Sequence, residues 1–124
     1  MTTATTTQQI VEAYGSAWNE TDEAKRRAVL ERSWADDGVY TDPQSHAEGR
    51  DALVQLIGGF QQQFGGASIV PTSNVDEHHG KLRFTWKMLG ADGKQVMEGI
   101  DFGELAPDGR IQRIVGFFGP APAI

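Results

Sequence analysis

The sequence predicts an α+β fold in which three N-terminal helices pack on a strongly curved antiparallel or mixed sheet, forming a cone around an apolar pocket. Two observations predict this fold. In the first half of the chain, apolar residues recur at spacings of three and four, as they do on the buried face of a helix. The second half reads as short strands divided by Asp-Gly pairs, which are typical of turns between antiparallel strands.

Composition limits the classes of protein to which the chain can belong. A length of 124 residues predicts one domain over residues 1–124, and the Thr-rich residues 1–7 are expected to be flexible. The formal charge of -6 argues against nucleic-acid binding, which needs clustered Lys and Arg. No apolar run approaches the ~20 residues of a membrane span, and no signal peptide is recognisable, so we expect a cytoplasmic protein without membrane contact. With no cysteine and three histidines, a metal site is not expected.

The first two helices are predicted from apolar spacing and a capping signal. Residues 10–19 form the first helix, with Tyr14 and Trp18 on its apolar stripe. Thr21 and the acids after it predict the start of a second helix that ends near Trp34. The basic residues 25–27 are assigned to the solvent-exposed face of this second helix.

The third helix is predicted from Arg50 to the glycine pair at residues 65–66, which closes its C-terminus. A second glycine pair, at residues 58–59, lies inside this helix and costs about 1 kcal/mol per glycine relative to alanine. That cost indicates that another group approaches the helix closely at this point.

A short strand at residues 39–41 is predicted between the second and third helices. Asp37-Gly38 reads as the turn before it, and Pro43, which lacks a backbone donor, stops it just after Asp42. Residues 44–48 are expected to form a loop. The remaining strands are predicted at residues 68–78, with an interruption at Pro71, and at residues 82–89, 96–105 and 110–119.

The two Asp-Gly turns set the register of the last three strands, because residues opposite each other across a hairpin share a sheet face. The face that carries large apolar residues should be covered by the helices, since the other face of residues 82–89 is basic and polar. The pairs predicted on that inner face are Met88 with Met97, Trp86 with Gly99, Phe84 with Asp101, Leu82 with Gly103, Gly103 with Ile114, Asp101 with Gly116, and Gly99 with Phe118.

Asp101 is the only acid on this predicted inner face. A carboxylate in apolar surroundings is costly when ionised, so we expect its pKa to be raised and the side chain to donate a proton near neutral pH. Acids with shifted pKa values gather at functional sites. The structural alternative is that Asp101 bonds a backbone amide, or that a bulge turns it outward.

Three stretches together resemble the nuclear transport factor 2-like (NTF2-like) superfamily, and within it the ketosteroid isomerase and SnoaL-like polyketide cyclase branch. They are residues 10–14 (IVEAY), residues 41–43 (TDP), and residues 99–102 (GIDF) with 117–119 (FFG). The resemblance covers nearly the whole chain and implies a cone-shaped α+β barrel.

The resemblance also implies site residues. In the isomerases, a tyrosine on the first helix and a protonated aspartate on a late strand donate hydrogen bonds to the substrate's oxygen, while an aspartate before a proline moves the proton. Tyr14, Asp101 and Asp42 stand at matching positions. Structural roles remain open for two of them: Tyr14 as a core residue and Asp42 as a turn-forming acid.

Aromatic and sulfur-containing side chains are candidates to line the pocket or to fill the core. His46 is a further candidate, either as the partner of Asp42 in an acid–base pair or as an exposed loop residue. The predicted pocket-lining residues are Trp18, Trp34, Tyr40, His46, Phe60, Phe84, Trp86, Met88, Met97, Gly99, Ile114 and Phe118.

The sequence and the resemblance together imply a cofactor-independent acid/base enzyme that acts on a small hydrophobic carbonyl compound, as a steroid isomerase does. The alternatives are a SnoaL-like cyclase, a dehydratase or epoxide hydrolase, and a non-catalytic binding or dimerisation module. A homodimer formed through the sheet is expected. The non-catalytic reading predicts that Asp42 and Asp101 face apart, or that the cone is filled.

Overall fold

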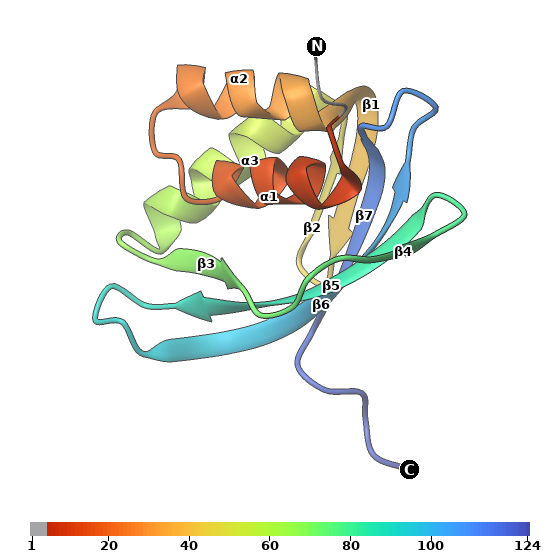
Figure 1. Ribbon diagram of the computed structural model, residues 1–124. Helices are drawn as coiled ribbons and strands as arrows, with labels where there is room; N and C mark the ends of the chain where they lie inside the picture. Colours follow the sequence, from red (N-terminus) through yellow and green to blue (C-terminus); the bar gives the residue numbers. More distant parts are fainter. Residues whose placement is uncertain (1–4) are drawn as a thin grey trace.

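The computed structural model describes residues 5–124, and Figure 1 shows three helices covering one side of a curved sheet. The predicted fold class is confirmed. The helices are α1 (Thr7–Ala17), α2 (Glu23–Ser33) and α3 (Arg50–Gln63), and the strands are β1 (Trp34–Asp42), β2 (Ser45–Glu48), β3 (Ser68–Pro71), β4 (Asp76–His78), β5 (Lys81–Leu89), β6 (Gln95–Leu105) and β7 (Ile111–Phe118).

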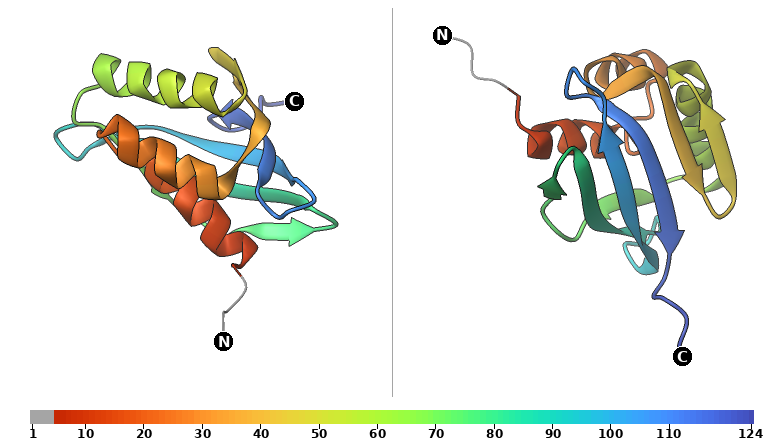
Figure 2. Two further views of the ribbon diagram at one scale, coloured as in Figure 1. Left: turned by 90° about the horizontal axis from the view of Figure 1, so that it is seen from above. Right: turned by 90° about the vertical axis from the view of Figure 1, so that its right-hand side faces the viewer.

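The sheet is mixed, with strand order β2-β1-β7-β6-β5-β3 and with β4 paired to β5. β1 runs parallel to β7, and the other strand pairings among residues 5–124 are antiparallel. Figure 2 shows the long strands β5, β6 and β7 side by side, with β1 and β2 continuing the sheet. The parallel contact brings a strand from the first half of the chain beside the last strand.

The predicted register of β5, β6 and β7 is confirmed. Phe84 lies opposite Asp101, and Asp101 lies opposite Gly116. The Trp86–Gly99 and Gly99–Phe118 pairs are also formed as predicted. Because side chains alternate between the faces of a strand, this register turns Asp101 toward the helices.

Helix α1 begins earlier than the spacing of its apolar residues predicted. The side chain of Thr6 accepts a hydrogen bond from the backbone N–H of Gln9, and the side chain of Gln9 accepts one from the backbone N–H of Thr6. This capping box satisfies two donors that a helix start leaves unpaired. Within the segment predicted to be flexible, Thr6 is thus the N-cap and Thr7 the first residue of α1, and residues 1–4 lie outside the described part.

Asp22, and not Thr21 as predicted, caps helix α2. The prediction that the basic side chains of residues 25–27 are exposed is wrong for Arg26. Arg26 is 3% exposed, and its guanidinium donates to the carbonyl of Val54 at 3.1 Å and to Oε1 of Gln61 at 2.7 Å. A Cβ at Gly58 would lie 3.1 Å from Nη1 of Arg26. The close approach predicted at this glycine is thus made by an arginine that crosses from α2 to α3.

Strand β1 is longer than predicted, and Asp37-Gly38 is part of it rather than a turn. Trp34 pairs with Ile111 and Val39 pairs with Arg113, so β1 bulges between these two positions along β7. The segment expected as a loop forms β2 instead, with Thr41 opposite His46. A polar strand at a sheet edge has little apolar periodicity, which is why the pattern did not reveal it.

The core lies between the helices and the sheet. Trp34 and Ile114 are fully buried in it, and the ring of Tyr14 stacks on that of Trp34 with 5.4 Å between ring centroids. Aromatic pairs of this kind contribute about 0.5–1.5 kcal/mol beyond area burial. Among residues 5–124, no helix is both long and apolar enough to cross a membrane.

Candidate functional site

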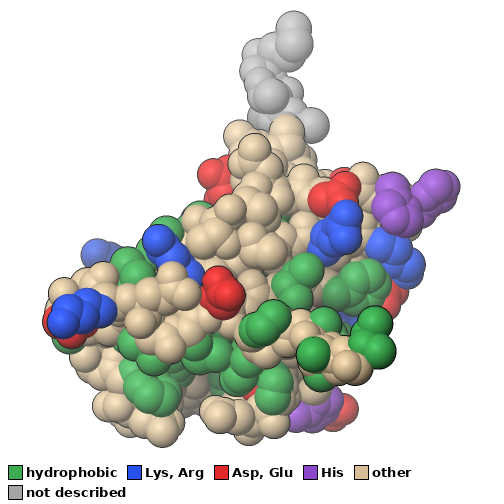
Figure 3. All heavy atoms as spheres, turned by 90° about the horizontal axis from the view of Figure 1, so that it is seen from below, with side chains coloured by type: hydrophobic (Ala, Val, Ile, Leu, Met, Phe, Trp, Pro, Cys, Tyr) green, Lys and Arg blue, Asp and Glu red, His purple; other side chains and the backbone are tan. Residues whose placement is uncertain are grey.

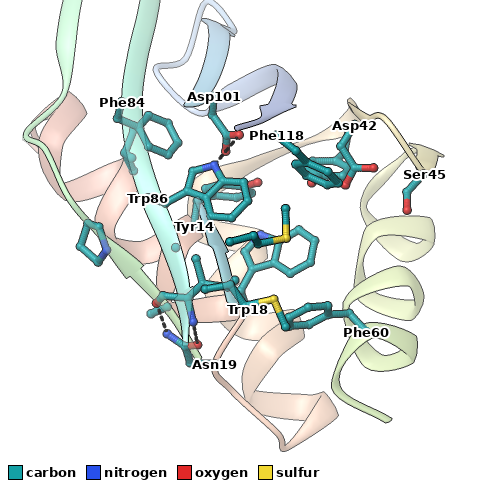
Figure 4. A pocket seen from close by; sticks show the side chains of 18 of the residues that line it. Tyr14, Trp18, Asn19, Asp42, Ser45, Phe60, Phe84, Trp86, Asp101 and Phe118 are labelled. Carbon is teal, nitrogen blue, oxygen red and sulfur yellow. Dashed lines mark hydrogen bonds between the residues drawn. The ribbon is translucent and has the colours of Figure 1, made fainter. Parts of the chain in front are cut away.

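An apolar cavity of about 780 Å³ lies between α1, α3 and the inner face of the sheet. Its volume is that of a small-molecule site. Figure 4 shows aromatic side chains and two carboxyl groups around this space. The predicted residues that line it are Tyr14, Trp18, Tyr40, Asp42, Phe60, Phe84, Trp86, Met88, Met97, Asp101 and Phe118.

Three predicted lining residues belong to the layer beneath the cavity. Trp34 and Ile114 have no exposed surface, because Trp34 lies under Tyr14 and Ile114 packs in the core. Gly99 is covered by Trp86, whose ring would be 2.3 Å from a Cβ at that position. Apolar character in the sequence does not separate a cavity wall from the core behind it.

His46 also lies outside the cavity. It is exposed on β2, where its Nδ1 is 2.9 Å from Oγ1 of Thr41 and its Nε2 is 3.3 Å from Oε1 of Glu48. The predicted acid–base pair with Asp42 is therefore not formed. The reason is the short β1–β2 hairpin, which places the side chains of Asp42 and His46 on opposite faces of the sheet.

Sequence reasoning missed the polar rim of the cavity. Gln8, Glu12 and Ser16 line it from α1, and Asn19 lines it from the turn that follows this helix. The spacing of four between Gln8, Glu12 and Ser16 places them on one face of the helix, so helical periodicity applied to polar residues is the signal that could have found them. Further lining residues that the prediction omitted include Gln44, Ser45, Gln63, Ile69, Val75 and Val96.

The two acids of the inner face are brought together across a glycine. Asp101 lies opposite Gly116 on β7, and the β1–β7 pairing of Thr41 with Val115 places Asp42 beside Gly116 on the other side. A Cβ at Gly116 would be 2.9 Å from Oδ1 of Asp101 and 3.5 Å from Cβ of Asp42. The missing side chain leaves the space that both carboxyl groups border.

Asp101 is 5% exposed, and Nε1 of Trp86 donates a hydrogen bond to its Oδ1 at 3.0 Å. Burial raises the pKa of Asp101 to about 7, with the nearby Asp42 adding to the rise and the Trp86 hydrogen bond opposing it. The expected inward position and raised pKa are both found. Near neutral pH this side chain can therefore donate a proton in a hydrogen bond.

Asp42 is half-buried at the end of β1 and accepts two hydrogen bonds. The hydroxyl of Tyr40 donates to Oδ2 at 2.6 Å, and the backbone N–H of Gln44 donates to Oδ1 at 2.8 Å. Burial raises the pKa of Tyr40, so this hydroxyl keeps its proton and stays a donor. Each oxygen of Asp42 thus accepts one hydrogen bond, and the carboxyl group is held in place as an acceptor at the cavity.

Tyr14 lies deep in the cavity, is 2% exposed, and is held by its stacking on Trp34. Burial raises its pKa well above the ordinary value, and the neighbouring Asp101 raises it further. The phenol is therefore neutral and can donate a hydrogen bond to an oxygen atom in the cavity.

These groups divide into donors and one acceptor. Tyr14 and protonated Asp101 offer O–H groups, while Asp42 offers a carboxylate, and all three line the same apolar space. Among the described residues that line it there is no Lys, Arg or His. The site is suited to moving a proton on an uncharged molecule while hydrogen bonds stabilise a developing negative oxygen.

Comparison with known proteins places the chain in a family. The model of the SnoaL-like domain matches residues 11–114, so the chain belongs to the SnoaL-like family. The fold is that of the NTF2-like and ketosteroid isomerase-like proteins, as the resemblance in the sequence implied. A search of curated proteins found no match.

Three solved structures illustrate this similarity. A "putative isomerase of the SnoaL-like family" from Agrobacterium tumefaciens is 34% identical, with a TM-score of 0.85 over 90% of this chain and 95% of that one. A "putative polyketide cyclase" from Sinorhizobium meliloti is 19% identical, with a TM-score of 0.68 over 86% of this chain and 92% of that one. A hypothetical protein with a ketosteroid isomerase-like fold from Catenulispora acidiphila, solved with trimethylamine, is 14% identical, with a TM-score of 0.72 over 92% of this chain and 88% of that one.

Proposed function

We propose that the protein is a cofactor-independent enzyme that moves a proton next to the carbonyl group of a small hydrophobic compound, as a steroid isomerase does. One observation carries the proposal: a single apolar cavity holds Asp42, which accepts two hydrogen bonds, and Asp101, whose pKa is raised to about 7. Two identical acids in different surroundings can serve as a base and as a hydrogen-bond donor in one reaction.

In the proposed reaction, Asp42 removes a proton from the carbon next to the carbonyl. The electrons of that C–H bond form the enolate, and its oxygen accepts hydrogen bonds from Tyr14 and neutral Asp101. Asp42 then returns the proton to a different carbon, which shifts the double bond. Nothing is oxidised or reduced in this sequence.

A cyclisation is the second candidate, because the same enolate could attack another carbonyl of the substrate. Its support is the name of the Sinorhizobium meliloti neighbour and the room in the cavity. A dehydratase would have been favoured by an Asp42–His46 pair, and this pair is not formed because His46 contacts Thr41 and Glu48 instead. The non-catalytic module required acids that face apart or a filled cone, and both acids border one cavity.

The proposal is tested by isomerisation of a β,γ-unsaturated 3-ketosteroid, with binding of a phenol that mimics the enolate measured in parallel. Asp42→Asn should lower kcat by about 10²–10⁴-fold, since general base catalysis contributes that much, while the phenol still binds. Glu48→Gln is the matched control, because Glu48 is an exposed acid on the neighbouring strand β2. Full turnover by Asp42→Asn would contradict its role as base, and phenol binding without steroid turnover by the wild type would favour the cyclase.

We also propose a homodimer formed through the outer face of the sheet. Phe102 is 42% exposed and Phe117 is 59% exposed, and both lie on this face beside Ile100 and Val115. Figure 3 shows hydrophobic side chains over the strands, with charged side chains around them. Phe117→Lys should convert the dimer to a monomer in analytical ultracentrifugation, and a monomeric wild type would contradict this proposal.

A further inference from the structure

The indole of Trp86 contacts Asp101 in a defined geometry. Trp86 lies two residues after Phe84 on β5, opposite Gly99, and its ring occupies the space that a side chain at Gly99 would take. The ring of Phe118 meets it edge-on, with 5.9 Å between centroids and an angle of 89° between planes. Held in this way, Nε1 of Trp86 points to Oδ1 of Asp101 at 3.0 Å, as Figure 4 shows.

The chemistry of the indole distinguishes the two oxygens of Asp101. An indole N–H can donate a hydrogen bond and cannot accept one. In a protonated carboxyl group, the carbonyl oxygen is the better acceptor and the other oxygen carries the proton. Oδ1 accepts from Trp86, and Oδ2 has no hydrogen-bond partner among the described residues.

We propose that Trp86 is a positioning residue that holds Oδ1 of Asp101 as the acceptor, so that the acid proton resides on Oδ2 and is offered to the substrate's oxygen. This inference rests on the proposed function, in which Asp101 donates to the enolate oxygen. Trp86 thus acts through Asp101 and takes no proton itself. It also stabilises the ionised form of the same acid, so it sets the upper end of the pH range in which the donor is present.

The groups that face Asp101 limit what else could produce such a pH dependence. Asp42 and Tyr40 face it from β1, and Tyr14 faces it from α1. The flanking positions on β5 and β7 are Phe84 and Gly116, which do not titrate. Both tyrosines have raised pKa values and keep their protons, so neither changes charge in the pH range where Asp101, with a pKa of about 7, titrates.

Trp86→Phe tests the proposal, because it keeps an aromatic ring and removes the N–H donor. The pKa of Asp101 in the free protein is followed through the carboxyl ¹³C signal, which is assigned by its loss in Asp101→Asn. A hydrogen bond to a charged group contributes enough to shift a pKa by about 1 unit. We expect the pKa of Asp101 to rise by that amount from about 7, and the alkaline limb of the rate profile to rise with it.

The matched control is Phe102→Leu, which removes an aromatic ring from the exposed outer face next to Asp101 and leaves the Trp86 N–H and its packing in place. It should change neither the pKa of Asp101 nor the position of the alkaline limb. In Trp86→Phe, kcat should fall by on the order of tenfold to a hundredfold, because a misplaced donor is costly in a positioned reaction, and KM should change much less.

The outcomes separate this inference from the proposed function. An unchanged Asp101 titration in Trp86→Phe, or an equal shift in Phe102→Leu, would overturn the role of Trp86. A wild type without isomerase or cyclase turnover would overturn the proposed function, and with it the catalytic part of this inference. The ¹³C titration would then still decide whether Trp86 controls the protonation of Asp101.

Discussion

Asp42 and Asp101 have the same side chain and lie on either side of Gly116, but their surroundings differ. Asp101 is buried among Phe84, Trp86 and the core, and a single indole N–H contacts its carboxyl group. Asp42 lies at the end of a strand, half-buried, and accepts hydrogen bonds from a hydroxyl and a backbone amide. Burial and donor count, rather than residue type, thus distinguish the proposed hydrogen-bond donor from the proposed base.

A large effect on kcat and on stability together should come from filling the space between the two acids. Gly116→Val places a branched side chain where a Cβ alone would be 2.9 Å from Oδ1 of Asp101. Both carboxyl groups must then move, so kcat should fall by on the order of a hundredfold, and overpacking should lower the free energy of unfolding by about 1–3 kcal/mol. Steady-state kinetics and urea unfolding measure the two effects. A wild-type kcat in this variant would show that the positions of Asp42 and Asp101 around Gly116 do not matter for the reaction.

A second prediction removes the charge of the buried acid. The pKa of Asp101 is raised from 3.8 to about 7, so between these pH values the folded protein holds a proton that the unfolded chain releases. Stability should therefore fall as pH rises through this window. Asp101→Asn should flatten that fall and stabilise the protein at pH 8 relative to wild type, by up to about 4 kcal/mol.

The measurement for Asp101→Asn is urea unfolding at pH 5 and at pH 8. The same variant keeps a neutral N–H donor in place of the acid, so its rate profile should lose the alkaline limb of the wild type. Asp42→Asn is the control for stability, because it removes a charge at the half-buried position of the pair. A wild type equally stable at both pH values would show that Asp101 is not held protonated.

The smallest effect should come from the donor to Asp42. Tyr40→Phe removes the 2.6 Å hydrogen bond to Oδ2 and leaves the backbone bond to Oδ1 in place. Because one of two donors remains, kcat should fall only several-fold, consistent with about 1 kcal/mol per hydrogen bond. A loss as large as that of Asp42→Asn would mean that Tyr40 itself contacts the reacting atoms.

The Asp101 side of the site could be predicted from the sequence, and the Asp42 side could not. Two Asp-Gly turns and alternating side chains are local signals, and they gave the register that turns Asp101 inward. Asp42 was assigned by resemblance, because its neighbour Gly116 is far away in the sequence. The parallel pairing of β1 with β7 could not be predicted from a turn, because no short turn joins parallel strands.

Other differences have a similar cause. Arg26 was expected in solvent because arginine usually is, but carbonyl groups of the α1–α2 connection and of α3 meet its guanidinium in the fold. Trp34 was expected at the cavity and is in the core beneath Tyr14. In both cases the position of the side chain depends on how the helices pack against one another and against the sheet.

The helices, the late hairpins and the inward position of Asp101 could be predicted from sequence alone, because they depend on turns and periodicity within short segments, while the family followed from the resemblance of three motifs. Tertiary structure decided the parallel β1–β7 contact, the placement of Asp42 across Gly116 from Asp101, the outward position of His46 and the cavity wall. These features require groups from distant segments to meet, and the burial and hydrogen bonds that set their chemistry exist only once those segments have packed together.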